Sequence, residues 1–181
     1  LHDSIKRHFG AGWRGMKICY SVEDTPLGTG GATWKALRMA TRDDVFVFNG
    51  DTYFDIDLSV LHDFHLSLGA DITLALKPMR DILRYGSVAL KDGRIVGFRE
   101  KSKTAEGLIN GGVYVISRRL TGRIAFPETF SLESDLLEKM AGAITIGGSV
   151  QEGYFIDIGM PEDYARAQRE LPLRPPGQAP K

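Results

Sequence analysis

Apolar side chains along the first half of the chain follow the spacing of strands that alternate with helices. Residues 16–22 alternate apolar and polar side chains, which is the period of a strand. Residues 45–48, Val-Phe-Val-Phe, are continuously apolar, which is typical of a strand buried on both faces of a parallel sheet. Helical spacing predicts helices over 32–40 and 58–68, and residues 72–76 are expected to form the next strand.

The second half of the chain predicts more strands and fewer helices. The expected strands cover residues 86–90, 94–99, 108–116, 144–146 and 154–158. Helices are expected over 132–140, with Ser131 or Ser134 as the N-cap, and from Pro161 onward. This order predicts an α/β fold with a mixed sheet, in which ligands bind outside the carboxyl ends of the strands.

The two ends of the chain are expected to differ from this core. Ile5 and Phe9 precede Gly10 at helical spacing, which predicts the end of a helix, so we expect the domain to be incomplete at its N-terminus. The proline-rich stretch 171–181 predicts a mobile tail or linker. One catalytic domain is therefore expected over residues 1–170.

Composition narrows the class of protein. The 181 residues include 23 Lys and Arg against 23 Asp and Glu, a formal net charge of zero that argues against a nucleic-acid binder. No apolar run approaches the ~18 residues of a membrane span, and no signal-peptide pattern is present. Cys19 is the only cysteine, which favours a cytoplasmic protein without disulfides.

Two aspartates at predicted strand ends are candidate metal ligands. Asp51 follows the apolar run 45–48 after Gly50, and Asp157 ends the strand near residue 156. Carboxylates placed in this way can hold Mg²⁺ and leave positions for water and phosphate oxygens. For Asp51 the alternative is a turn residue that bonds its own backbone, and Asp157 by itself is more typical of a helix N-terminus.

Other polar motifs are weaker. The segment Gly28-Thr29-Gly30-Gly31 opens a helix, and its N–H groups either face an anion or allow close contact with a flat base. Asp55 and Asp57 form a D-x-D pair, but Asp57 precedes a helix and is better explained as its N-cap. His62 and His65 on that helix are expected to lie on a solvated face. Glu100, Lys101 and Asn110 can together bind sugar hydroxyls and a phosphate, but by themselves they are better explained by a surface ion pair and a bulged strand.

Six short runs of sequence occur in an order that resembles the sugar-1-phosphate nucleotidyltransferases. They are residues 23–32 (EDTPLGTGGA), 48–51 (FNGD), 84–86 (RYG), 98–101 (FREK), 110–114 (NGGVY) and 157–164 (DIGMPEDY). Residues 49–58 are similar to those of heptose-1-phosphate guanylyltransferases in particular, followed by mannose-1-phosphate guanylyltransferases. The resemblance covers about residues 1–170 and implies a Rossmann-like, three-layer nucleotidyltransferase fold with a mixed, mostly parallel sheet.

The resemblance also implies an activity and a role for each motif. The enzyme would transfer GMP from GTP to heptose 1-phosphate and release pyrophosphate; thymidylyl or uridylyl transfer, or a non-catalytic regulatory homologue, are the alternatives. Asp51 and Asp157 would bind Mg²⁺, and Lys101 would add positive charge near the attacking phosphate. The nucleotide would lie against Glu23, Gly28, Thr29, Gly30 and Gly31. The sugar 1-phosphate would lie against Tyr85, Gly86, Glu100, Lys101, Asn110 and Gly111.

One family motif is missing from the sequence. Members begin with a strand and a loop of the form G-G-x-G-T-R-L that holds the triphosphate, and nothing in these 181 residues matches it. The chain on its own is therefore expected to be poorly active and marginally folded. The family resemblance leaves a homo-oligomer open.

Overall fold

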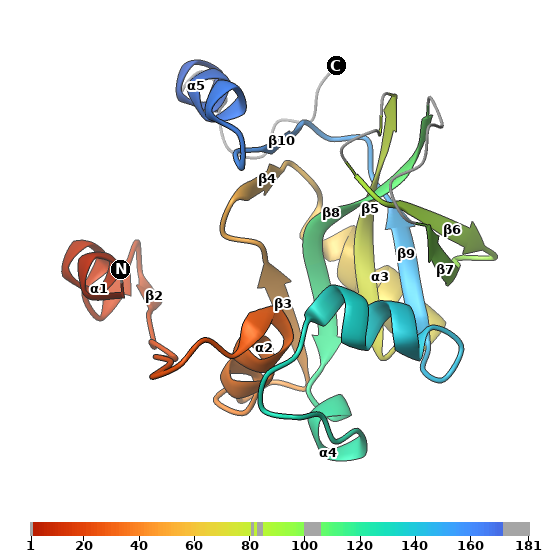
Figure 1. The fold of residues 1–181 in the computed structure, drawn as a ribbon, viewed down its shortest axis with the longest axis horizontal. Coiled ribbons are helices and arrows are strands. Elements are labelled where there is room, and N and C mark those ends of the chain that lie inside the picture. Colours follow the sequence, from red (N-terminus) through yellow and green to blue (C-terminus); the bar gives the residue numbers. More distant parts are fainter. Residues whose placement is uncertain (1, 81, 83–84, 100–105, 172–181) are drawn as a thin grey trace.

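The structure is a computed structural model that describes residues 2–80, 82, 85–99 and 106–171. Its centre is a six-stranded sheet in the order β3-β8-β5-β9-β7-β6, with helices on both faces (Figure 1). The strands are β3 (Asp44–Phe48), β5 (Ile72–Arg80), β6 (Ser87–Lys91), β7 (Arg94–Arg99), β8 (Glu106–Ser117) and β9 (Ile146–Val150). The predicted α/β fold with a mixed sheet is confirmed.

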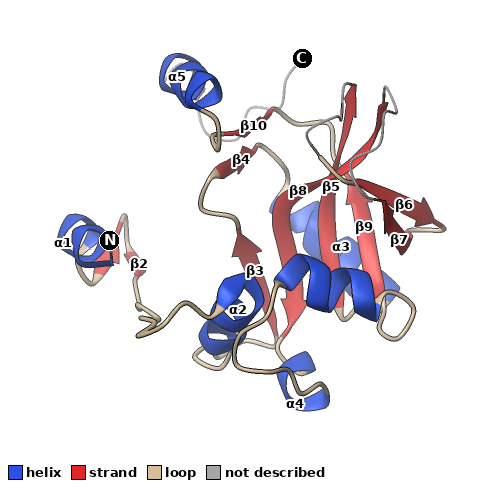
Figure 2. Ribbon diagram, in the orientation of Figure 1, coloured by secondary structure: helices blue, strands red, loops and turns tan. Residues whose placement is uncertain are grey.

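The strand directions differ in part from the expectation. Between neighbours in the described sheet, β5 and β9 are parallel, whereas β8 runs antiparallel to both β3 and β5, and β6 and β7 form an antiparallel hairpin (Figure 2). The prediction of mostly parallel pairing is therefore wrong for these strands. The hairpin turns at Asp92 and Gly93, whose φ angles of 50° and 75° are those that a two-residue hairpin turn requires.

The core lies on both faces of β8, because successive side chains of a strand point to opposite faces. Tyr114 and Ile116 belong to a large cluster with residues of α2 and of η1, the helix in front of the sheet in Figure 1. Val113 and Val115 belong to a smaller cluster that includes Leu61 of α3 behind the sheet. These helices are α2 (Gly28–Leu37), α3 (Leu58–Leu68) and η1 (Leu132–Glu138). The expected three-layer arrangement is confirmed.

The helix termini show which sequence signals set their bounds. The Asp57 carboxylate accepts hydrogen bonds from the backbone N–H groups of Ser59 and Val60, so its predicted role as N-cap of α3 is confirmed. Ser131 caps η1 by accepting from the Ser134 N–H. However, η1 is a π-helix and not the α-helix expected over 132–140.

Strand β3 is less buried than the sequence suggests. Within the described residues it pairs only with β8, and its side chains are half-buried up to Phe48, which is 54% exposed. The prediction of a strand buried on both faces is therefore wrong. The backbone groups along this edge of β3 could pair with a further strand.

The N-terminal residues form a separate small unit at the side of the sheet (Figure 1). Helix α1 (His2–Phe9) ends at Gly10, whose φ of +62° fits the predicted C-terminal glycine. The hairpin of β1 (Gly12–Trp13) and β2 (Met16–Lys17) follows, so the strand expected over 16–22 is wrong beyond Lys17. In the part of the chain that the structure describes, residues 18–22 pair with no strand.

Three short elements and the last helix complete the fold. They are β4 (Thr52–Phe54), α4 (Leu120–Arg123), β10 (Phe155–Asp157) and α5 (Pro161–Glu170). As predicted, α5 begins with a proline in its first turn. Among the described residues, no helix has the length and apolar character needed to cross a bilayer. The proposed tail over 171–181 lies outside the described residues except for Leu171.

Candidate active site

Asp51 and Asp157, far apart in the sequence, lie on neighbouring strands. The chain leaves β3 at Phe48, turns through Asn49 and Gly50, and enters β4 directly after Asp51. Strand β10 pairs antiparallel with β4 and places Asp157 opposite Thr52. The Ile158 N–H also donates to the Asp51 carbonyl oxygen at 2.9 Å. The fold therefore brings the two aspartates to neighbouring backbone positions, and a shared metal ion stays a prediction.

The two carboxylates retain capacity for a cation. One oxygen of Asp157 accepts from the Gly159 N–H at 2.8 Å, and one oxygen of Asp51 is 3.4 Å from the Thr52 hydroxyl. Among residues 2–80, 82, 85–99 and 106–171, no cluster of three or more metal-ligating side chains exists. Two carboxylates fit Mg²⁺, which commonly takes one or two of them and completes its octahedron with water and phosphate oxygens.

A cavity of about 390 Å³ lies beside Asp51, between the start of α2 and the end of β3. Its walls are Thr29, Thr33, Val47, Phe48, Asn49, Gly50, Asp51, Leu132 and Glu133. It contains Thr29, one of the predicted nucleotide-binding residues, and an exposed aromatic side chain, Phe48. We call this space the nucleotide-side pocket.

The glycines near this pocket serve close packing. The helix begins at Gly28 and not at residue 32, and the N–H groups of Gly30 and Gly31 both donate to the Phe130 carbonyl, at 3.0 and 3.3 Å. A Cβ at Gly30 would lie 2.3 Å from the Phe130 ring. These two N–H groups are thus already bonded and do not face an anion. The close approach seen here is to Phe130, and contact of the motif with a flat base stays a prediction.

Glu23 and Thr29 shape the entry to α2. The Glu23 carboxylate accepts from the Leu27 N–H at 2.9 Å and fixes the turn before the helix. The Thr29 hydroxyl accepts from the Leu132 N–H and donates to Glu133, both at 2.9 Å. Thr29 therefore joins the first turn of α2 to the first turn of η1. Contact of either residue with a nucleotide stays a prediction.

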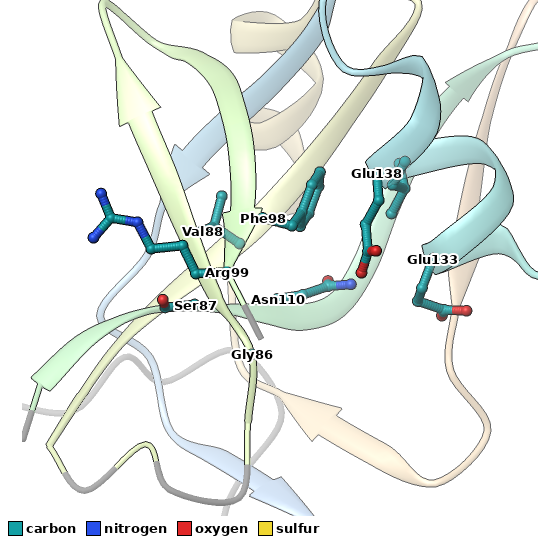
Figure 3. A pocket seen from close by; sticks show the side chains of 9 residues that line it. Gly86, Ser87, Val88, Phe98, Arg99, Asn110, Glu133 and Glu138 are labelled. Atoms are coloured by element: carbon teal, nitrogen blue, oxygen red, sulfur yellow. The ribbon is translucent and has the colours of Figure 1, made fainter. Parts of the chain in front are cut away.

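A second cavity, of about 470 Å³, lies between the β6–β7 hairpin, β8 and η1 (Figure 3). Its walls are Gly86, Ser87, Val88, Phe98, Arg99, Asn110, Glu133, Leu137 and Glu138. We call it the sugar-side pocket, because it contains Gly86 and Asn110 from the predicted sugar-binding set. Tyr85 adjoins it in the chain and packs edge-on against Phe155. Arg84, Glu100 and Lys101 lie outside the described residues.

Asn110 is held in place by a buried tyrosine. Its side-chain nitrogen donates to the Tyr114 hydroxyl oxygen at 2.8 Å, and its oxygen accepts from the Gly112 N–H at 3.1 Å. Burial, together with the nearby charges of Glu133 and Asp51, raises the pKa of Tyr114, so the hydroxyl stays neutral. Gly111 packs so closely that a Cβ there would meet the Phe54 ring at 2.4 Å, and no role beyond packing is visible for it.

Glu133 and Glu138 face the site and were not among the predicted residues. Glu133 lines both pockets, whereas Glu138 lines only the sugar-side pocket. Their spacing of five residues does not mark one face of an α-helix, and this is why the sequence gave no reason to pair them. In a π-helix, by contrast, residues five apart lie near one another, so this spacing becomes informative once the segment is known to be a π-helix.

The chain as a whole is similar to proteins of known family. The family model described as nucleotidyl transferase matches residues 1–173. The chain is 46% identical to the D-glycero-alpha-D-manno-heptose 1-phosphate guanylyltransferase of Aneurinibacillus thermoaerophilus, over 94% of this chain and 74% of that protein. It is 36% identical to the mannose-1-phosphate guanylyltransferase of Mycobacterium tuberculosis, over 87% of this chain and 45% of that protein.

A solved structure is similar in fold as well as in sequence. HddC from Yersinia pseudotuberculosis, complexed with GMP-PN, superimposes with a TM-score of 0.79 and 32% identity. The match covers 94% of this chain and 72% of that one. The relatives matched over most of their own length are thus the heptose-type proteins, whereas the mannose-type relative extends well beyond the matched region.

Proposed function

The chain belongs to the nucleotidyl transferase family, and from this premise we propose that it transfers GMP from GTP to heptose 1-phosphate and releases pyrophosphate. The observation that carries the proposal is the junction of two pockets beside a pair of aspartates from neighbouring strands. One pocket suits a nucleotide and the other a sugar. The reaction requires both substrates to meet at one phosphate.

The chemistry is a substitution at the α-phosphorus of GTP. An oxygen of the sugar phosphate forms a new bond to that phosphorus, while the bond to the β-phosphate oxygen breaks and pyrophosphate leaves with the electron pair. The attacking phosphate is already ionised, so no general base is needed. Because both reactants are anions, the main obstacles are their repulsion and their alignment, which the protein lowers by charge and positioning.

We propose that Asp51 and Asp157 hold Mg²⁺. When bound, the ion supplies positive charge that offsets the repulsion between the two phosphates. The two carboxylates fix where that charge sits, because β4 and β10 are tied together by backbone hydrogen bonds. Asp57 is already used as the cap of α3, so the D-x-D pair has no part in this site.

The remaining motif residues are proposed to bind the substrates. Glu23, Gly28, Thr29, Gly30 and Gly31 would lie against the nucleotide; the position of Thr29 in the wall of the nucleotide-side pocket supports this. Tyr85, Gly86, Glu100, Asn110 and Gly111 would contact the sugar 1-phosphate. Lys101 would place a positive charge next to the attacking phosphate. A cytoplasmic location agrees with the single free Cys19.

A different sugar or base is the main alternative within this family. Mannose 1-phosphate is the second candidate, because a mannose-1-phosphate guanylyltransferase also matches the chain. A matrix of nucleoside triphosphates against sugar 1-phosphates, read by pyrophosphate release with Mg²⁺ present, tests the choice. The highest kcat/KM is expected for GTP with heptose 1-phosphate. Greatest activity with another pair would replace this substrate assignment, and pyrophosphate release with none would favour a binding protein.

The activity of residues 1–181 alone is proposed to be low, because the sequence contains no G-G-x-G-T-R-L loop for the triphosphate. Within the residues that the structure describes, one edge of β3 has no partner strand, which supports this proposal, since a further strand there would bury its half-exposed side chains. A chain extended at its N-terminus with such a strand and loop is expected to turn over GTP at least about 100-fold faster. Equal rates for the two chains would refute the proposal.

A further inference from the structure

We propose that Glu138, on the π-helix η1, binds hydroxyl groups of the sugar at the end remote from the phosphate and thereby selects a heptose over a hexose. This inference rests on the proposed function and deepens it. Glu133, on the same helix face, is proposed to bind the part of the sugar nearer the phosphate. Neither residue belongs to the motifs that mark the family in the sequence.

The π-helix brings Glu133 and Glu138 to the wall of one pocket, although the Glu138 carboxylate points toward Asn110 and the Glu133 carboxylate points away from it (Figure 3). In a π-helix hydrogen bonds run between residues five apart, and here the Ser131 carbonyl accepts from the Leu136 N–H at 3.3 Å as well as from the Asp135 N–H at 3.1 Å. Residues five apart therefore lie near one another on the surface. In an α-helix, at 3.6 residues per turn, the same two positions would be separated by about 140° around the axis. Glu133 and Glu138 both line the sugar-side pocket as a result.

The helix is fixed from its N-terminus. Ser131 donates its N–H to the Asp135 carboxylate at 2.8 Å, and its hydroxyl accepts from the Ser134 N–H at 3.2 Å. Lys139 then bonds Asp135 at 2.7 Å. Leu132, Leu136 and Leu137 anchor η1, because all three are buried in the main core cluster. The carboxylates are thus presented by a rigid element, as a binding site requires.

Glu133 marks the junction of the two pockets. One of its oxygens accepts from the Thr29 hydroxyl at 2.9 Å and is 3.3 Å from the Ser131 hydroxyl. These bonds hold the side chain at the boundary between the nucleotide-side and sugar-side pockets, whose walls it shares. The sugar phosphate must approach the nucleotide across this boundary, so the phosphate-bearing end of the sugar lies here.

Glu138 lies on the other side, one turn further along η1. It lines only the sugar-side pocket, and its carboxylate points toward Asn110 across the cavity (Figure 3). The Arg99 guanidinium points away from both (Figure 3). Val88, Phe98 and Leu137 supply an apolar wall beside these polar groups. An apolar surface beside hydrogen-bond acceptors suits the C–H face and hydroxyl groups of a sugar.

The position of Glu138 sets which hydroxyls it can bind. With the phosphate on C1 directed toward Asp51, the other end of the sugar extends toward Glu138. A heptose carries one more hydroxyl-bearing carbon than mannose, and this carbon is at the end opposite C1. A carboxylate there gains a charge-assisted hydrogen bond only with the longer sugar.

The test is calorimetric titration of the 181-residue chain with heptose 1-phosphate and, separately, with mannose 1-phosphate. Glu138→Gln is expected to weaken heptose 1-phosphate about tenfold and mannose 1-phosphate less than twofold, because a hydrogen bond to a charged group is lost only with the former. Glu133→Gln is expected to weaken both sugars equally. Glu162→Gln, the same change at an exposed position on α5, is the control and should alter neither.

The outcomes separate this inference from the proposed function. An equal loss for both sugars in Glu138→Gln, or no loss, overturns the inference while the proposed function stands. A wild-type chain that binds neither sugar 1-phosphate overturns the proposed function and the inference together. The thermal unfolding temperature of each variant must match that of the wild type. Glu138→Ala, which removes the carboxylate altogether, is expected to show the same selective loss of heptose 1-phosphate binding. An equal loss for both sugars in Glu138→Ala, or no loss, also overturns the inference.

Discussion

The two ends of β3 each carry acidic side chains, but they use them in opposite ways. At the start of the strand, Asp44 lies 3.2 Å from His62 and 3.5 Å from His65, and His65 also bonds the Thr73 hydroxyl at 2.8 Å. Beyond its end, Asp51 is exposed and, among the described residues, has no basic partner. The side chains of the first cluster bond to one another within the protein, whereas we propose that Asp51 binds a metal ion.

A second aspartate at each end follows the same division. Asp71, near the start of β5, pairs with Arg123 and accepts from the Thr145 N–H at 3.0 Å. Asp157 accepts only a local N–H from Gly159 in the part of the chain that the structure describes. Acidic residues that are paired with basic groups stabilise a fold, and acidic residues without such partners can exchange water for a cation. The two groups of aspartates differ in whether a basic side chain or a histidine pairs with them, and this difference separates the structural group from the proposed metal ligands.

The sharpest test of this division is Asp51→Asn in a chain extended with the triphosphate loop. Loss of one carboxylate is expected to lower pyrophosphate release at least about 1,000-fold, with thermal stability unchanged, because the side chain is exposed and makes no core contact. Asp55→Asn, in the same segment, is the matched control. An unchanged rate in Asp51→Asn would remove this residue from the mechanism.

At the other end, Asp44→Asn is expected to affect stability and not turnover. The change weakens the bonds to His62 and His65, and we expect the free energy of unfolding to fall by about 1–3 kcal/mol. Chemical denaturation measures it. The control is Asp43→Asn, which removes an exposed ion pair with Arg118 and should cost less than about 0.5 kcal/mol. A loss of kcat/KM in Asp44→Asn at unchanged stability would contradict the division.

The smallest expected effect is a dependence of stability on pH through His65, which is 2% exposed. Burial lowers the pKa of His65 below its ordinary value of 6.5; Asp44 and Asp71 oppose this shift and His62 adds to it. The unfolded state therefore binds the proton first, so stability is full above pH 6.5 and declines as the pH falls below it. Melting temperatures at pH 7.5 and 5.5 should differ less in His65→Gln than in the wild type, whereas His8→Gln, at an exposed position, should leave the difference intact.

Local signals in the sequence were enough for much of the fold. Asp57 as a helix cap and the apolar run 45–48 as a strand each depend on a few neighbouring residues, and the structure contains both features. The burial of β3 and the pairing of residues 18–22 depend on distant partners, which the local pattern does not specify. Those expectations were wrong for that reason.

The site was predictable to a similar extent. Asp51 and Asp157 came from short motifs in a known order, and the structure places them on adjacent strands. His65 was expected on a solvated face, but Thr73 and Asp44 pair with it in the interior. Glu133 and Glu138 could not be found, because a pattern of apolar residues does not distinguish a π-helix from an α-helix.

The π-helical turn of η1 makes the position of Glu138 sensitive to the deletion of a single residue. The wide turn between Ser131 and Leu136 contains one residue more than an α-helical turn. Deleting that residue would swing everything after it by about 100°, carrying Glu138 off the pocket wall while Glu133 stayed in place. A one-residue deletion between positions 132 and 138 is therefore expected to weaken the preference for heptose 1-phosphate that we propose for Glu138, in the same direction as Glu138→Gln.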